Sequence, residues 1–231
     1  MSDFASRLAA LHHDLIAQGE RVFELLIKAV ESYFDLDKAK AGQVVAADDV
    51  IDRVDVEIER ASIPLLAMGV TDEHSIRSVL TIVKVNNELE RIADLGVTIA
   101  EVVQGYPDLR ERVPNTFRVM ANSVIGMLRD ANRALADGNA ALAQQVLLFD
   151  DTVSRFKEEI VLDAQEKIAD GGFSVQFGFR LMTVTKAVER IADHCTNICE
   201  QVIYLQSGKI VRHRPEGWSD PEEAGTAPSV G

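Results

Sequence analysis

Pairs of acidic residues one helical turn apart are the feature of this sequence best suited to chemistry. Glu90-Arg91-Ile92-Ala93-Asp94 returns ninety-nine residues later as Glu189-Arg190-Ile191-Ala192-Asp193. Two like charges at positions i and i+4 destabilise a helix by about 0.2 to 0.5 kcal/mol. Because this cost occurs twice with the same residue types, the pattern indicates a compensating cation or basic partner. The alternative is a solvated acidic face, in which each arginine pairs weakly with the aspartate three residues later.

Each pair extends into a longer acidic stripe. At about 100° per residue, Glu90, Asp94 and Glu101 fall within roughly 40° of one another, well away from the apolar residues of the same helix. The second copy repeats this arrangement with Glu189, Asp193 and Glu200. We therefore expect both stripes to face outward from the core, and we count Glu101 and Glu200 among the candidate metal ligands.

A further acidic ladder precedes the first pair and is poorly kept in the second copy. Asp48, Asp52, Asp55 and Glu59 share one helical band about 60° wide. Of these only the first has an acidic counterpart, Asp150. The other three positions hold Ser154, Lys157 and Val161. If the helices of each half pack side by side, the first half should hold more metal, or hold it more tightly, than the second.

Clustered carboxylates are hard oxygen ligands, which suit iron, manganese, magnesium or calcium, or several ions bridged by shared carboxylates. The sequence lacks a Gly-x-Ser-x-Gly elbow, a Gly-rich phosphate loop and a His-Glu-x-x-His motif. It also lacks the Glu-x-x-His pairs of a di-iron oxidase. We therefore predict no enzymatic activity.

Three residues beside the second acidic pair have open roles. His194 could reach a metal, although a lone helical histidine is more often a surface or capping group. Cys195 and Cys199 lie outside any Cys-x-x-Cys motif and are expected to be buried free thiols. Trp218 is assigned no role.

The composition favours a folded protein of the reducing cytoplasm. Apolar residues make up 47% of the 231 residues and charged residues 26%, which is ordinary for a globular chain. The formal charge of −13 opposes binding to nucleic acid or anionic lipid and favours cations or basic protein surfaces. Residues 1–20 contain acids and histidines and no apolar segment, so neither export nor membrane insertion is predicted.

The elements that must position these acids are long helices. Apolar residues recur at spacings of three and four residues, which is typical of helices, and the sequence shows no convincing strand. Glycine, or an Asp, Thr or Ser able to cap, marks breaks near residues 35–37, 68–72, 105–108, 137–139, 170–172 and 208. The fold class is therefore all-α, with six long helices in two pseudo-symmetric three-helix bundles. The expected units are residues 1–105, residues 106–212 and a disordered tail, 213–231.

Together these motifs resemble the PhoU family of phosphate-uptake regulators over roughly residues 4–213. The resemblance is carried by Glu88-Leu89-Glu90-Arg91-Ile92-Ala93-Asp94 and by the stretch from Val188 to Glu200. Ile203-Tyr204, Gly208 and Val211-Arg212-His213 extend it to the end of the second half.

The resemblance implies a cytoplasmic, all-helical regulator that often self-associates, as a homodimer or higher oligomer. It implies contact with the ATPase subunit of a phosphate ABC transporter and with a phosphate-sensing histidine kinase. It also implies iron or zinc bound by Glu/Asp-x-x-x-Asp motifs. The implied ligands are Glu90 with Asp94, Glu189 with Asp193, Asp48 with Asp52, and Asp150, whose motif is interrupted by Ser154.

Two alternatives to a phosphate regulator remain open at this point. One is a carboxylate-rich helical protein that binds or stores metal for its own sake. The other is a helical accessory scaffold of a different transporter, whose acidic residues are merely solvated.

Overall fold

The computed structural model describes residues 3–69, 72–105, 111–214 and 217–219. The described residues form seven helices and one two-stranded hairpin. The helices are α1 (Asp3–Asp35), α2 (Lys38–Ala67), α3 (Glu73–Gln104), α4 (Asn115–Asp137), α5 (Ala140–Leu147), α6 (Asp150–Ala169) and α7 (Val175–Ser207). The strands are β1 (Arg212–Arg214) and β2 (Gly217–Ser219). The predicted all-α fold class is confirmed.

The helices begin and end where short polar side chains and glycines allow it. The Asp37 carboxylate accepts backbone N–H groups of the first turn of α2, and the Ser174 hydroxyl does the same for α7. Gly138 and Gly208 follow α4 and α7 with φ of 60° and 75°, a left-handed conformation that glycine adopts at little cost. The helix bounds place a helix end at each of the six predicted breaks.

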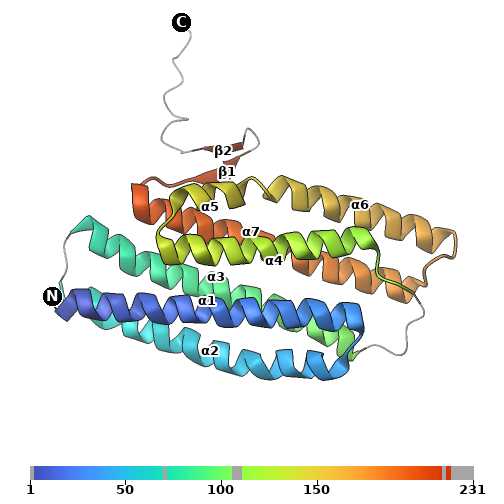
Figure 1. Cartoon of the computed structure of the whole chain (residues 1–231), viewed down its shortest axis with the longest axis horizontal. Helices are drawn as coiled ribbons and strands as arrows, with labels where there is room; N and C mark the ends of the chain where they lie inside the picture. The colour runs from blue at the N-terminus through green and yellow to red at the C-terminus, as the bar shows by residue number, and fades with distance from the viewer. Residues whose placement is uncertain (1–2, 70–71, 106–110, 215–216, 220–231) are drawn as a thin grey trace, which may run out of the picture.

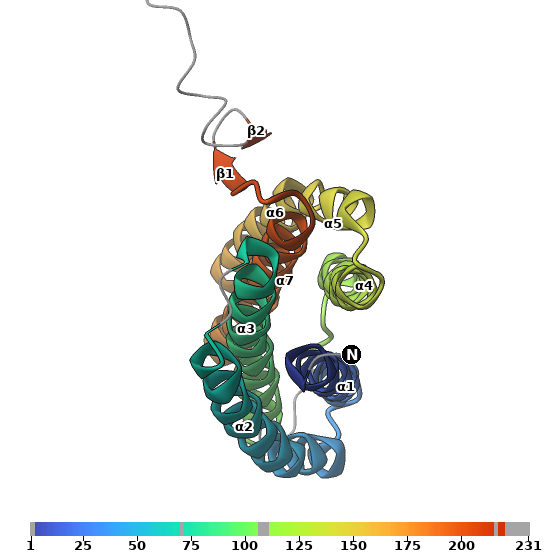
Figure 2. The ribbon, with the colours of Figure 1, turned by 90° about the vertical axis from the view of Figure 1, so that its left-hand side faces the viewer.

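The helices lie lengthwise beside one another (Figure 1). Seen end-on, α2, α3, α7 and α6 follow an arc, with α1 and α4 together on one side of it (Figure 2). In the first half α1 packs on α2 and α3; in the second, α4 packs on α5, α6 and α7. Helices α3 and α7 also pack on each other, so they join the two halves at the centre of the arc. This leaves the outer side of α2, α3, α7 and α6 for the acidic residues.

One helix differs from the prediction, because the fifth expected helix is broken into α5 and α6. At the break, Leu148 and Phe149 donate backbone hydrogen bonds to carbonyls three residues earlier, a 3₁₀-like tightening of the turn. Both residues keep right-handed helical dihedrals. Neither glycine nor proline lies at this position, so the sequence pattern gave no sign of the break.

The end of the described chain also differs from the prediction of no strand. Strands β1 and β2 pair antiparallel, with His213 opposite Trp218. The rest of the expected tail, residues 215–216 and 220–231, lies outside the described residues. No helix in the described part of the chain is both long and apolar enough to cross a membrane.

Candidate functional site

The facing sides of α2 and α3 bring two of the predicted acidic pairs together. Asp48 and Asp52 come from α2, and Glu90 and Asp94 from α3. The charges of Asp52 and Asp94 both act on Asp48 and on Glu90. We call these four residues the first acidic cluster. Arg91 contacts its α3 pair, with Nε 3.3 Å from Glu90 Oε2 and Nη1 3.3 Å from Asp94 Oδ2, but this exposed arginine offsets only part of the charge.

The raised pKa of Asp48 shows that the nearby carboxylates destabilise its ionised form. Partial burial, followed by the charges of Asp52, Asp94 and Asp49, raises the pKa of Asp48 from 3.8 to about 6. Its Oδ1 atom is buried and has no hydrogen-bond partner within the described residues. Burial and the nearby carboxylates also raise the pKa of Glu90. The ionised cluster is therefore less stable than the same carboxylates in water, and a cation would relieve this cost.

A second acidic cluster lies between α6 and α7 and consists of Asp150, Glu189 and Asp193. Burial, then the charges of Asp150 and Glu189, raise the pKa of Asp193 to about 6, although His194 and Arg190 act in the opposite direction. The side chain of Lys157 reaches into this cluster, with Nζ 3.2 Å from Glu189 Oε1.

The two clusters differ because of this lysine. Lys157 of α6 stands at the position that Asp55 occupies in the first half. Asp55 adds negative charge near Glu90, whereas Lys157 forms an ion pair with the corresponding Glu189. The second cluster thus carries its own counter-charge, while the first has an additional carboxylate.

Neither cluster is a finished metal site. Within the described residues, no group of three or more His, Cys, Asp or Glu side chains is arranged to hold a metal ion. Ser154, the interruption in the last motif, is partly buried on α6. The fold therefore brings the predicted carboxylates near one another without converging them on one point.

The two remaining predicted ligands lie apart from these clusters. Glu101 is exposed on α3. Glu200 is buried, with 7% of its surface exposed, so the prediction that it faces outward was wrong. The reason is that α7 packs against α3, α4, α5 and α6, which leaves little of the Glu200 side chain accessible.

The comparisons with known proteins now decide the family. The family model of the PhoU domain matches residues 15–103 and, a second time, residues 117–202. The chain belongs to the PhoU family. Each PhoU match holds a Glu-x-x-x-Asp pair, Glu90 with Asp94 in the first and Glu189 with Asp193 in the second.

PhoU proteins of several bacteria are similar to this chain over most of its length. It is 29% identical to "Phosphate-specific transport system accessory protein PhoU homolog 1" of Thermotoga maritima over 208 residues, covering 89% of this chain and 90% of the relative. It is 30% identical to a PhoU homolog of Clostridium acetobutylicum over 216 residues, covering 90% and 96%. The crystal structure of PhoU from Pseudomonas aeruginosa matches with a TM-score of 0.84 at 27% identity, covering 89% of this chain and 100% of that one.

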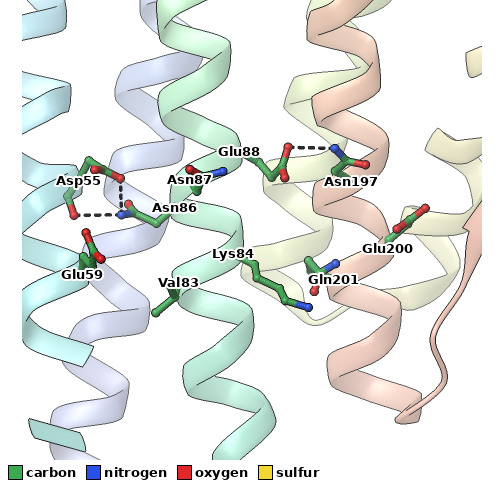
Figure 3. A pocket seen from close by; sticks show the side chains of 10 residues that line it. All are labelled: Asp55, Glu59, Val83, Lys84, Asn86, Asn87, Glu88, Asn197, Glu200 and Gln201. Atoms are coloured by element: carbon green, nitrogen blue, oxygen red, sulfur yellow. Dashed lines mark hydrogen bonds between the residues drawn. The ribbon is translucent and has the colours of Figure 1, made fainter. Parts of the chain in front are cut away.

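Sequence reasoning on this PhoU chain missed a polar network between α3 and α7. Nδ1 of His194 lies 2.6 Å from Oε2 of Glu88, and Asn197 Nδ2 donates to the same oxygen at 3.0 Å (Figure 3). Burial raises the pKa of Glu88, but the hydrogen bonds from His194 and Asn197 outweigh it and bring the pKa below its usual value. His194 therefore contacts a carboxylate of the other half and is only partly exposed.

The prediction that the two cysteines are buried free thiols is confirmed. Cys195 and Cys199 are buried and free, and burial raises the pKa of both thiols. Both remain protonated at neutral pH, which makes them poor nucleophiles and poor metal ligands.

Proposed function

We propose that this chain is a metal-binding regulatory adaptor, without catalytic turnover, that lowers phosphate uptake and phosphate-starvation signalling when phosphate is plentiful. The observation that carries the proposal is the PhoU match in both halves of the chain. The similar proteins of Thermotoga maritima and Clostridium acetobutylicum are named as accessory proteins of phosphate-specific transport systems. The proposed partners are the ATPase subunit of a phosphate ABC transporter and a phosphate-sensing histidine kinase, in the cytoplasm.

The metal-binding part of the proposal rests on the first acidic cluster. Its carboxylates are hard oxygen donors, and the buried Oδ1 of Asp48 lacks a hydrogen-bond partner within the described residues. The donor set fits iron or zinc, and equally manganese, magnesium or calcium. Asp52 and Asp94 are exposed, so only the surface ion pair of Asp94 with Arg91 opposes their rotation toward an ion near Asp48 and Glu90.

The structure supports unequal metal binding by the two halves. Lys157 competes with a cation for Glu189, whereas Asp55 reinforces the first cluster. We propose that metal binds first and more tightly between α2 and α3.

Association with other molecules follows from charge. An acidic outer side on a chain of net charge −13 attracts basic protein surfaces, and bound metal would lower that charge. Self-association as a homodimer or higher oligomer is part of the proposal, and light scattering during gel filtration measures it.

The regulator proposal is tested in the native host. Deleting the gene should release phosphate repression, and the wild-type gene should restore it. Tagged protein should retain the transporter ATPase subunit or the histidine kinase. If repression persists without the gene and neither partner is retained, the regulator proposal fails. Metal bound under those conditions would indicate a metal-storage protein instead.

A further inference from the structure

A polar groove of about 600 Å³ crosses the outer side of α2, α3 and α7 (Figure 3). Its volume lies in the range of small-molecule sites. Four carboxylates line it: Asp55 and Glu59 from α2, Glu88 from α3 and Glu200 from α7. The lining has one cationic side chain, Lys84. The groove therefore attracts cations and repels anions.

Two amide side chains of the lining have oxygen atoms without a donor. Asn86 is 2% exposed and Gln201 is 8% exposed. Asn86 Oδ1 and Gln201 Oε1 are buried and accept no hydrogen bond from the described residues. A buried acceptor without a donor costs free energy. Both atoms therefore favour a ligand that carries N–H groups.

The carboxylates of the groove are held apart from one another. Asn86 Nδ2 donates to Asp55 Oδ1 at 2.6 Å, which fixes that carboxylate on the α2 side. His194 and Asn197 fix Glu88 on the α7 side of α3. In the part of the chain that is described, no three of these groups converge to hold a metal ion. Separated and fixed anions match several linked positive charges better than they match one small ion.

We propose that this polar groove binds a small organic polycation with several ammonium groups, of the polyamine class. A primary ammonium group has three N–H donors and a secondary one has two, which can serve the carboxylates and the two orphan amide oxygens together. Lys84 lies near α7, with Nζ 5.8 Å from the Tyr204 ring centroid. Its single positive charge offsets only part of the negative charge of the four acids. The ligand would bridge the two halves of the chain at their α3–α7 contact. This site adjoins the first acidic cluster through Asp55, and the proposal does not depend on the proposed phosphate regulation.

Calorimetric titration of spermidine into the full chain, with chelator and at low salt, tests the proposal. Glu59→Gln and Glu88→Gln each remove one carboxylate and should weaken binding by about fivefold to tenfold. Glu59 is exposed, so its variant should fold normally. Lys84→Gln removes the opposing charge and should tighten binding about threefold. Asp14→Asn, an exposed acid on α1, is the matched control and should leave affinity unchanged.

Three results would overturn the proposal. The first is no binding of spermidine by the wild-type chain. The second is equal weakening by Asp14→Asn and the groove variants, which would mean diffuse attraction to an acidic protein. The third is weaker spermidine binding by Lys84→Gln, which would contradict the argument that the charges of the groove hold the ligand. None of these results depends on a transporter, a kinase or bound metal, so the proposed function would stand or fall separately.

Discussion

Replacing Asp48 by asparagine should stabilise the metal-free protein at neutral pH. Asp48 is partly buried beside Asp52 and Asp94, and its pKa is raised from 3.8 to about 6. The folded state therefore holds this proton more tightly than the unfolded chain does. Between pH 3.8 and about 6 the folded state binds more protons, so the free energy of unfolding falls as pH rises. Above that window the full cost of the ionised carboxylate is present.

The size of the effect follows from the same pKa. A rise from 3.8 to about 6 corresponds to an upper limit of about 3 kcal/mol. Because the side chain is only partly buried, solvent screens much of this interaction and leaves about 1 kcal/mol. Asparagine has nearly the same shape and no charge. It should therefore recover about 1 kcal/mol at pH 7 and almost nothing at pH 4.

Urea unfolding in the presence of a chelator measures this difference at the two pH values. Asp14→Asn removes an exposed acid from α1 and controls for the general relief of negative charge. Added metal should make the wild type more stable than Asp48→Asn, because metal binds to the folded wild type and binds more weakly to the variant, which lacks one carboxylate. If Asp48→Asn is no more stable than Asp14→Asn at pH 7, or if its advantage is the same at pH 4, the ionised Asp48 does not destabilise the folded protein.

Three further changes probe other parts of the structure. Lys157→Asp removes the ion pair with Glu189 and should raise the metal bound per chain by elemental analysis; unchanged metal would mean that the lysine does not limit the second cluster. Glu88→Gln removes the carboxylate held by His194 and Asn197 and should destabilise the protein by about 1 kcal/mol at pH 7. Since the pKa of Glu88 is lowered, that loss should shrink as pH falls below 4.5 in urea unfolding; a pH-independent loss would contradict the assignment. Gly96→Ala places a methyl group against Leu25 where α3 meets α1 and should cost about 1 to 3 kcal/mol in thermal or urea unfolding; a neutral effect would mean that this contact is loose.

The fold and the two Glu-x-x-x-Asp pairs could be predicted because they are local. Helix periodicity, glycine breaks and capping residues act within a few positions of one another. The break at Leu148 and Phe149 was missed because no helix-breaking residue marks it. There the backbone N–H groups donate to the carbonyl three residues earlier, where an α-helix would use the carbonyl four residues earlier. The hairpin that begins at Arg212 was missed because a three-residue strand is too short to show an alternation of apolar and polar residues.

The polar groove and the network of Glu88 could not be predicted for a different reason. They depend on how α3 and α7 lie beside each other, and a helical wheel describes only one helix at a time. The same limit explains Glu200, whose angle on the helix matches Asp193 but whose surroundings bury it. The inequality of the two clusters, by contrast, is visible in the sequence, because Lys157 replaces Asp55 at the same repeat position.

Metal binding by the first acidic cluster can be measured by counting the metal in the purified protein. The chain would be incubated with iron, zinc or manganese, desalted and analysed by mass spectrometry beside Asp52→Ala and Asp150→Ala. Metal is expected in the wild type, with loss of most of it in Asp52→Ala and a smaller loss in Asp150→Ala. A wild-type protein free of metal, or loss only in Asp150→Ala, would mean that the first acidic cluster is not the main metal site.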